Sequence, residues 1–329
     1  MISFKALEIS ELSPGNFTDK IVTKTIDDIA NGHILIKTQY SSLNYKDCLS
    51  ISGHKGVTRE YPHIPGIDCA GEVVKTKTKD FNIADKVIVT GYDLGMNHPG
   101  GFAEYLSVPG EWAVPLPDNL TLKQAMMFGT AGFTAMSAVL ALQNHFSDLT
   151  RKKILITGVT GGVGSITCFL LAELGNITIA STRDIGKKYL SKLPVDQLIN
   201  SKDFTIKQEK PLLAKSYDAV IDNLGGMVLE NIIKSISYHG MVISCGNVVG
   251  TTFTSSVFPF ILRGITLKGI SSANTEMPER KRIWQKISQF KDWQALEKII
   301  TEITLDQVPE KSTQILQGQH QGRFLIGHI

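Results

Sequence analysis

The chain has 329 residues, of which 42% are hydrophobic and 20% charged, a composition typical of a folded soluble protein and not of a disordered one. This length suggests about two domains. The 34 basic and 31 acidic residues leave a net charge of +3, too small to favour a nucleic-acid partner. Four scattered cysteines without a CxxC pair predict reduced thiols in a cytoplasmic protein. The first ten residues lack an apolar run, so no signal peptide is predicted.

The first 120 residues read as β-rich. Short strand-like runs are separated by Gly, Pro, Asn and Asp, which indicates a compact barrel-like fold. The predicted strands are 4–9, 33–40, 71–75, 86–90 and 103–108. Paired prolines in 114–117 stop helices and central strands, so this segment is predicted to be a connector.

A stretch without charged residues lies between Lys123 and His145, and its length raises the question of whether it spans a membrane. A spanning helix needs about 20 apolar residues. This segment contains glutamines, threonines and glycines, including Gly129 and Gly132. We therefore expect a buried helix pair whose small residues permit close packing, and no membrane anchor.

After residue 150, strands alternate with helices. Apolar strands are predicted at 153–157, 177–180, 197–200, 219–222, 241–244 and 265–270, with a helix over 165–174 and another around Tyr189. Such alternation predicts a parallel sheet covered on both faces. A late amphipathic helix is expected over 279–290 and a final strand over 322–326.

A glycine-rich turn joins the strand at 153–157 to the helix that follows. Gly158, Gly161 and Gly164 are spaced GxxGxxG, a weaker motif than GxGxxG. The strand before it and the helix after it are the context of a dinucleotide site. Glycines allow the backbone to approach a pyrophosphate, and a helix N-terminus supplies amide donors. A plain turn with accidental glycines is the alternative.

The end of the second strand of this region indicates which cofactor binds. An acidic residue there binds the ribose hydroxyls of NAD. This chain has Ser181, Thr182 and Arg183 instead, and an arginine fork suits the extra phosphate of NADP. Asp184 lies close by and keeps NAD possible, and a solvated Arg183 is the structural alternative.

Six motifs together make the chain resemble the medium-chain dehydrogenase/reductase superfamily. They are SSLNYKD at 41–47, IPGID at 64–68, GTAGFTAM at 129–136, the glycine turn at 158–165, PFILR at 259–263 and QGR at 321–323. Within that superfamily the chain looks most like the zinc-free quinone oxidoreductase branch, and most of all like its acryloyl-CoA reductase (NADPH) group. The resemblance implies a Rossmann doubly wound parallel sheet plus a β-rich GroES-like barrel catalytic domain. The expected domains are 1–122 with 271–329 for the catalytic domain, and 123–270 for the NADPH-binding domain.

Metal-binding relatives in this superfamily place a Cys and a His-Glu pair in the first two motifs. Here the positions hold Asn44 and the run Gly66-Ile67-Asp68. A catalytic zinc takes three protein ligands. His54 and His63 lie near these motifs, but no Cys/His set is closely spaced. The prediction is therefore that the protein has no metal site.

The resemblance implies an NADPH-dependent reductase that transfers hydride to the C=C bond of a short α,β-unsaturated thioester, such as acryloyl-CoA to propionyl-CoA. Two alternatives are open: an NADPH:quinone oxidoreductase and a non-catalytic NADPH-binding protein. The expected partner is a small enoyl-CoA or quinone, with no nucleic acid or membrane. An edge strand at 265–270 and the behaviour of relatives predict a homodimer.

Asn44 and Tyr45 are the predicted catalytic residues by this resemblance. Asn44 is expected to donate to the substrate carbonyl, and Tyr45 to bond the nicotinamide ribose or relay a proton. A turn role for Asn44 and a packed-ring role for Tyr45 are the structural alternatives. Asp47 is expected to anchor its own loop rather than to act in catalysis.

The remaining predicted site residues bind the cofactor by resemblance. They are Tyr45, Thr130, Thr134, Thr160, Gly161, Gly162, Val163, Ser181, Thr182, Arg183, Ser201, Asn247, Ile261, Ser272 and Arg323. Ser201 and Asn247 depart from the residues that relatives have there. Packing within the helix is an equal alternative for Thr130 and Thr134. A structural ion pair is the alternative for Arg323. A CoA tail would need basic residues, and the candidates are Lys55, Arg59, Arg263 and residues 280–282, any of which could instead be solvated.

Overall fold

The computed structural model describes residues 1–328, and these form two compact units. Among the described residues, unit 1 comprises 1–133, 272–293 and 300–328, and unit 2 comprises 134–271 and 294–299. Each unit contains its own hydrophobic core and is described by itself. The domains expected from the sequence, 1–122 with 271–329 and 123–270, stay a prediction.

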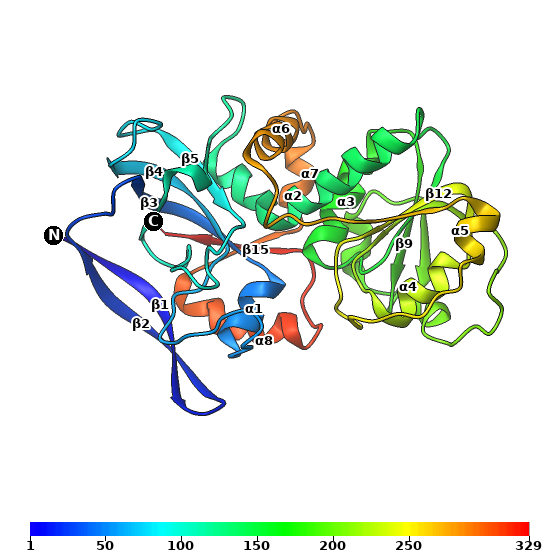
Figure 1. Cartoon of the computed structure of the whole chain (residues 1–329), viewed down its shortest axis with the longest axis horizontal. Helices are drawn as coiled ribbons and strands as arrows, with labels where there is room; N and C mark the ends of the chain where they lie inside the picture. The colour runs from blue at the N-terminus through cyan, green and yellow to red at the C-terminus, as the bar shows by residue number, and fades with distance from the viewer. Residues whose placement is uncertain (329) are drawn as a thin grey trace. The chain divides into compact units, whose positions relative to one another are not determined.

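Unit 1 is β-rich, as predicted. A hairpin of β1 (Ile2–Ser13) and β2 (Asn16–Ile26) forms a two-stranded sheet of its own, and a second sheet has the order β14-β15-β3-β4-β5-β7, with β6 paired to β3 (Figure 1). The bounds of these strands are β3 His33–Leu43, β4 Asp68–Thr76, β5 Lys86–Thr90, β6 Tyr105–Pro109, β7 Ala113–Pro115, β14 Ile300–Ile303 and β15 Arg323–Gly327. The final strand is therefore confirmed, and β15 joins the last residues of the chain to β3.

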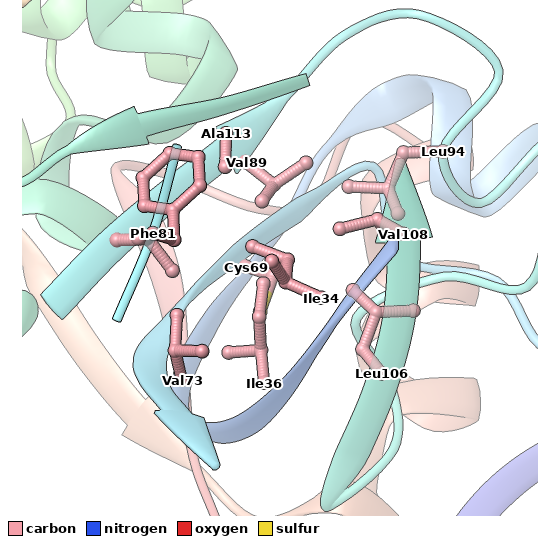
Figure 2. Close-up of a cluster of buried hydrophobic side chains, with 11 residues drawn as sticks. Ile34, Ile36, Cys69, Val73, Phe81, Val89, Leu94, Leu106, Val108 and Ala113 are labelled. Carbon is pink, nitrogen blue, oxygen red and sulfur yellow. The ribbon is translucent and has the colours of Figure 1, made fainter. Parts of the chain in front are cut away.

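The core of unit 1 is built from inward-facing residues that alternate along these strands. Ile34 and Ile36 of β3 are fully buried against Val73 of β4 and Val89 of β5 (Figure 2). Alternation of apolar and polar residues places one face of a strand in the core. This packing holds the C-terminal ends of β3 and the start of β4, where the site lies.

Three strands of unit 1 were not predicted, namely β2, β7 and β14. The segment 114–117, expected to be a connector, begins inside β7, which pairs with β5 at the edge of the sheet. Pro115 is exposed there, and a proline is tolerated on an edge strand because no ladder donor is required of it. The prediction was wrong because it considered central strands only.

Unit 2 is an open, wholly parallel sheet of six strands in the order β10-β9-β8-β11-β12-β13, as the alternation predicted. The strands are β8 Lys153–Ile156, β9 Ile177–Thr182, β10 Gln197–Asn200, β11 Tyr217–Asp222, β12 Ile236–Ser244 and β13 Thr266–Gly269. Its helices are α3 Gly162–Ala172, α4 Gly226–Ile233 and α5 Phe258–Arg263 (Figure 1). The strand order reverses between β8 and β11, and this is where such sheets bind ligands.

Helix α2 (Leu122–His145) is the uncharged stretch, and its backbone leaves helical geometry at Gly129, so two helices meet there. The predicted helix pair is confirmed. By length and hydropathy α2 is able to cross a membrane, but 89% of its most apolar window is buried inside the protein. A core helix meets the same criteria, and its burial identifies α2 as one.

The other helices lie near the C-terminal part of the chain. They are α6 Met277–Ile287, α7 Trp293–Glu297 and α8 Val308–Leu316, with α1 (Tyr45–Ile51) packed beside α8 in unit 1. The late amphipathic helix is thus confirmed as α6, with bounds shifted by two to three residues. The helix expected at Tyr189 is a short 3-10 turn, Lys188–Lys192.

Candidate active site

The loop that precedes α1 is held by a reciprocal cap. Asn44 is the N-cap residue, and its backbone N–H donates to Asp47 Oδ2 at 2.8 Å. The other oxygen of Asp47 accepts the backbone N–H of Ile67 at 2.8 Å. These bonds satisfy amide donors that the helix and the neighbouring loop leave free. Asp47 therefore anchors its loop, as the sequence indicated.

The carboxylate of Asp68, at the start of β4, is the centre of a buried polar cluster in unit 1. It is fully buried and accepts hydrogen bonds from three other residues. Asn44 Nδ2 donates to it at 2.8 Å, the Ser42 hydroxyl also donates to it, and Thr130 donates through its backbone N–H at 2.9 Å and its hydroxyl at 2.5 Å. Asp68 thereby joins β3, the α1 loop and α2.

Arg323, in the QGR motif, neutralises this cluster. Its side chain is 3% exposed, and Nη2 lies 4.0 Å from Asp68 Oδ2. It donates to Asn44 Oδ1 at 2.9 Å and to the Phe128 carbonyl at 3.2 Å. The structure supports the ion-pair alternative for Arg323. Its predicted role in binding the cofactor is corrected, because the guanidinium is buried on internal acceptors.

The expected role of Asn44 also requires correction. Its amide nitrogen donates to Asp68 and, at 3.2 Å each, to the Ser42 carbonyl and Asp47, while its oxygen accepts from Arg323. An amide has two N–H donors, and both are committed inside the protein. Asn44 therefore positions the loop rather than offering a donor to a substrate carbonyl.

Two buried carboxylates beside one arginine do not both ionise readily. Burial first, and the neighbouring negative charge of Asp68 second, raise the pKa of Asp47 to about 7. Burial lowers the pKa of Arg323, and the negative charges of Asp68 and Asp47 act in the opposite direction. At pH 7 the Asp47 carboxyl is therefore only partly ionised, and the Arg323 guanidinium lies beside the Asp68 carboxylate as its counter-charge.

We expect the Asp47 carboxyl to titrate near pH 7 in the folded protein. Its ordinary pKa is 3.8, so the folded state binds the proton more tightly than the unfolded state. The stabilisation from this group is therefore fully present below pH 4 and is lost as the pH rises through about 7. Carbon-13 NMR of the side-chain carboxyls checks this, with the exposed aspartates as internal controls. A midpoint for Asp47 near 4 would contradict it.

A kink in α2 leads into this cluster. Gly129 has a φ of 51°, and a Cβ there would lie 2.3 Å from Ser42 Oγ and 2.4 Å from Asp68 Oδ2. We expect Gly129→Ala to lower the free energy of unfolding by roughly 2–4 kcal/mol, because it adds backbone strain to a steric conflict. Denaturant unfolding measures this. Gly327→Ala, where the added methyl has nothing within 4 Å, is the matched control and should change stability by less than about 0.5 kcal/mol. Equal effects of the two substitutions would refute the role of Gly129.

Tyr45 and a small recess occupy the same part of unit 1. Tyr45 begins α1, is 37% exposed, and has no hydrogen-bond partner for its hydroxyl among residues 1–328. The recess has a volume of about 10 Å³, room for about one water molecule. Two predicted residues, Thr130 and Ser272, line it together with Lys46 and Tyr92. The structure thus brings Thr130 into both the recess and the Asp68 cluster.

The glycine turn in unit 2 has the geometry that a pyrophosphate requires. Gly158 has a φ of 60°, and a Cβ on Gly164 would lie 2.5 Å from the Gly158 carbonyl, so close packing there needs glycine. Gly161 is the N-cap of α3, and no side chain caps that helix. Its first amides therefore stay available to an anion. Thr160, Gly162 and Val163 are half-buried and Gly161 is exposed, all at this turn.

The predicted adenosine-side residues follow neighbouring parallel strands. Ser181 and Thr182 end β9, and Ser201 directly follows β10, whose Ile199 and Asn200 pair with them. All three are buried, and Ser181 Oγ has no hydrogen-bond partner. Arg183 is exposed directly after β9. These residues and the glycine turn share the carboxyl edge of the sheet.

Other predicted cofactor residues of unit 2 are more dispersed. Asn247 follows β12 and is exposed, with its Cα 3.2 Å from the Cβ position of Gly225. Ile261 lies on α5 and is 67% exposed, with no hydrogen bond or polar contact that ties it to the turn. Thr134 is buried in α2. The structure alone does not bring these three to the glycine turn.

Sequence reasoning missed a second polar group at the strand-order reversal. Thr157, after β8, donates to Asp222 at 2.7 Å, and Asn223, after β11, donates to the Thr157 carbonyl at 2.8 Å. The Asn223 oxygen is buried without a hydrogen-bond partner. This unused acceptor, like Ser181 Oγ, fits a site completed by a polar ligand. An Asp-Asn pair ending an apolar strand was the signal available in the sequence.

Two of the basic candidates for a CoA tail are structural. Arg280 is fully buried and donates to the carbonyls of Thr90 at 2.7 Å and Ala273 at 2.9 Å. Arg263 is buried and donates to the carbonyls of Lys234 at 3.0 Å and Ile236 at 2.8 Å. Both are corrected, because backbone acceptors occupy their guanidinium groups. Lys55 pairs with Glu11 at 2.6 Å, and Arg59 is exposed.

Metal ligands are not grouped in the described part of the chain. Within residues 1–328 no three His, Cys, Asp or Glu side chains are placed to hold a metal ion. Burial raises the pKa of the Cys48 and Cys69 thiols to about 12, which leaves them protonated at neutral pH. The absence of a metal site stays a prediction.

A doubly wound parallel sheet with a dinucleotide-type glycine turn, together with a β-rich unit, defines a class of nicotinamide-dependent oxidoreductases. Residues 30–118 match the family described as the alcohol dehydrogenase GroES-like domain. The chain is 38% identical to a Bacillus subtilis protein named "Putative quinone oxidoreductase YhfP" and 35% identical to the acrylyl-CoA reductase AcuI of Ruegeria pomeroyi, and each match covers 98% of both chains.

Solved structures agree with these relatives. The crystal structure of the yhdH oxidoreductase from Salmonella enterica in complex with NADP matches with a TM-score of 0.93 at 33% identity, over 99% of this chain and 100% of that one. The Bacillus subtilis yhfP structure with NAD bound matches with a TM-score of 0.94 at 36% identity, over the same shares. The protein belongs to the medium-chain dehydrogenase/reductase superfamily, in the branch that contains YhfP and AcuI.

Proposed function

We propose that the protein is an NADPH-dependent reductase of a short α,β-unsaturated thioester, with acryloyl-CoA as the first acceptor to test. The observation that carries this is the likeness to AcuI over 98% of both chains, together with a glycine turn shaped for a pyrophosphate. Reduction of a quinone is the second candidate, since YhfP is equally similar along its length. A non-catalytic NADPH-binding protein is the third, and it would have no need of the exposed, unpartnered Tyr45 hydroxyl.

The cofactor supplies a hydride when it is bound, and unit 2 would hold it. The uncapped N-terminus of α3 would take the pyrophosphate, and Ser181 with Arg183 the adenosine phosphate. Unit 1 would hold the acceptor, with the Asp68 cluster keeping the α1 loop rigid. Preorganised groups of this kind lower the barrier because they need no rearrangement during the reaction.

The test is NADPH oxidation with acryloyl-CoA, crotonyl-CoA and a panel of quinones, each assayed with and without prior chelator treatment. We expect the highest kcat/KM with acryloyl-CoA and no effect of the chelator, because the described residues offer no metal-ligand cluster. A higher kcat/KM for quinones would support the second candidate. Stoichiometric zinc in the purified protein, with activity lost on its removal, would refute the metal-free proposal.

Tyr45 is the proposed proton donor or relay in unit 1. Its phenol is protonated at pH 7 and is able to donate. Tyr45→Phe should lower kcat by about 10²- to 10⁴-fold, the usual value of acid-base assistance. Because the hydroxyl has no partner among residues 1–328, the thermal midpoint should not change. A kcat equal to that of the wild type would leave Tyr45 without a catalytic role.

Arg183 is the proposed cause of a preference for NADPH over NADH. A hydrogen bond to a charged group contributes roughly 1.5–3 kcal/mol, or about ten- to hundredfold in affinity. Arg183→Ala should therefore weaken NADPH binding by about that factor and barely change NADH binding. Asp184, also exposed, is the rival, since a carboxylate turned to the ribose would favour NADH. The kcat/KM ratio for the two cofactors, in wild type and variant, decides between them.

A homodimer is the proposed assembly. β13 is the edge strand of the parallel sheet, and the neighbouring α5 exposes Phe258, Ile261 and Leu262. An open, apolar edge invites pairing with a second copy. Light scattering should report twice the 36.1 kDa of one chain, and a monomer mass would refute this.

We further propose that the protein is cytoplasmic and has no nucleic-acid or membrane partner. The proposed domains are residues 1–122 with 271–329, and residues 123–270.

A further inference from the structure

Lys46 is a charged residue of unit 1 that takes no part in the Asp68 cluster. It is the second residue of α1, it is half-buried, and it has neither a hydrogen bond nor an ion pair to any residue in 1–328. It lines the recess together with Tyr92, Thr130 and Ser272. No carboxylate lines that recess, so nothing there neutralises the lysine.

Asp47 and Asp68 do not supply a counter-charge to Lys46. Asp47 points to the backbone amides of Asn44 and Ile67, and its raised pKa keeps it largely protonated below pH 7. Asp68 is balanced by Arg323. Neither carboxylate pairs with Lys46, so the positive charge of this lysine is not used by a neighbour among residues 1–328.

Tyr92, which lines the same recess as Lys46, is fixed by several contacts. Tyr92 has a φ of 53°, a conformation that costs energy for a bulky residue and that occurs most often at functional sites. Its ring stacks on Trp112 at 5.3 Å between centroids, and the Arg280 guanidinium lies 4.5 Å from the ring centroid. Its backbone N–H donates to the Ala273 carbonyl at 2.9 Å. The recess is therefore preformed rather than a gap in a mobile loop.

We propose that Lys46 is a further catalytic residue, the cation that stabilises negative charge on the carbonyl oxygen of the acceptor. This rests on the proposed function. In that reaction the β-carbon gains a hydride from NADPH, which becomes NADP⁺, and the C=C electron pair moves toward the carbonyl to form an enolate. A proton then adds to the α-carbon. A preplaced cation favours the enolate more than the neutral thioester, which is the condition for raising kcat.

The decisive variant is Lys46→Met, which keeps the aliphatic stem and removes the charge. We expect kcat for acryloyl-CoA to fall about 100-fold or more, with Lys46→Arg restoring it to within about tenfold of wild type. Lys79→Met removes an exposed lysine of the same unit and should leave kcat unchanged. The thermal midpoint and the Kd for NADPH should be the same in all these proteins, which separates the effect from misfolding or loss of the cofactor.

The rival role for Lys46 is to hold a phosphate of the CoA tail. Two measurements distinguish it. The binding of propionyl-CoA, titrated calorimetrically without turnover, should be unchanged in Lys46→Met if the lysine acts on the enolate. The kcat defect should also persist with the N-acetylcysteamine thioester of acrylate, which has no phosphates. A rise in KM alone, weaker propionyl-CoA binding, or a defect that disappears with the truncated thioester would overturn the proposal.

The two proposals fail in different ways. If wild-type protein reduces no enoyl thioester, the proposed function is refuted, and the Lys46 assignment falls with it. If the wild type is active and Lys46→Met keeps its kcat, only the assignment of Lys46 is refuted. The same variants assayed with any quinone that turns over should show the same loss, because a quinone carbonyl also acquires negative charge after hydride transfer.

Discussion

The carboxylate of Asp68 holds unit 1 together at the point where function is proposed. It accepts hydrogen bonds from β3, from the loop before α1 and from the kink of α2, and Arg323 brings the last strand of the chain to the same point. A buried carboxylate without these donors and the nearby guanidinium would cost several kcal/mol. Three regions far apart in the sequence, around residues 42–44, 130 and 323, are therefore held in one arrangement that satisfies this charge.

That constraint shapes what the neighbouring residues are able to do. Because Asn44, Thr130 and Arg323 are committed to Asp68 or to one another, they are unavailable as donors to a ligand. Tyr45 and Lys46, the next two residues along the chain, have no such partners and lie at the start of a helix that the cluster fixes. The Asp68 cluster thus fixes the backbone that carries Tyr45 and Lys46, whose side-chain polar groups have no partner among residues 1–328. Preorganised catalysis depends on such fixed and available groups.

In unit 2 the main constraint is that a phosphate must come close to the backbone of the glycine turn. Its glycine turn packs so closely that a side chain on Gly164 would meet the Gly158 carbonyl, and the helix that follows has no side-chain cap. Unpartnered acceptors at Ser181 and Asn223 lie on the carboxyl side of the same sheet. Relatives solved with NADP and with NAD share this chain's fold along nearly its whole length.

The parallel sheet, the glycine turn, the helix pair and the family were all predictable from sequence, because each depends on local periodicity, glycine spacing or a contiguous motif. β2 was missed because its alternation is weak, although it pairs with β1 in a hairpin, and β7 and β14 were missed because they are short and pair with strands that do not adjoin them in the sequence. Only the tertiary structure decided the roles of Asn44, Asp68 and Arg323. An isolated motif shows which donors and acceptors a residue has. Whether they are already used depends on partners as distant in sequence as residues 44 and 323, which only folding brings within hydrogen-bond distance.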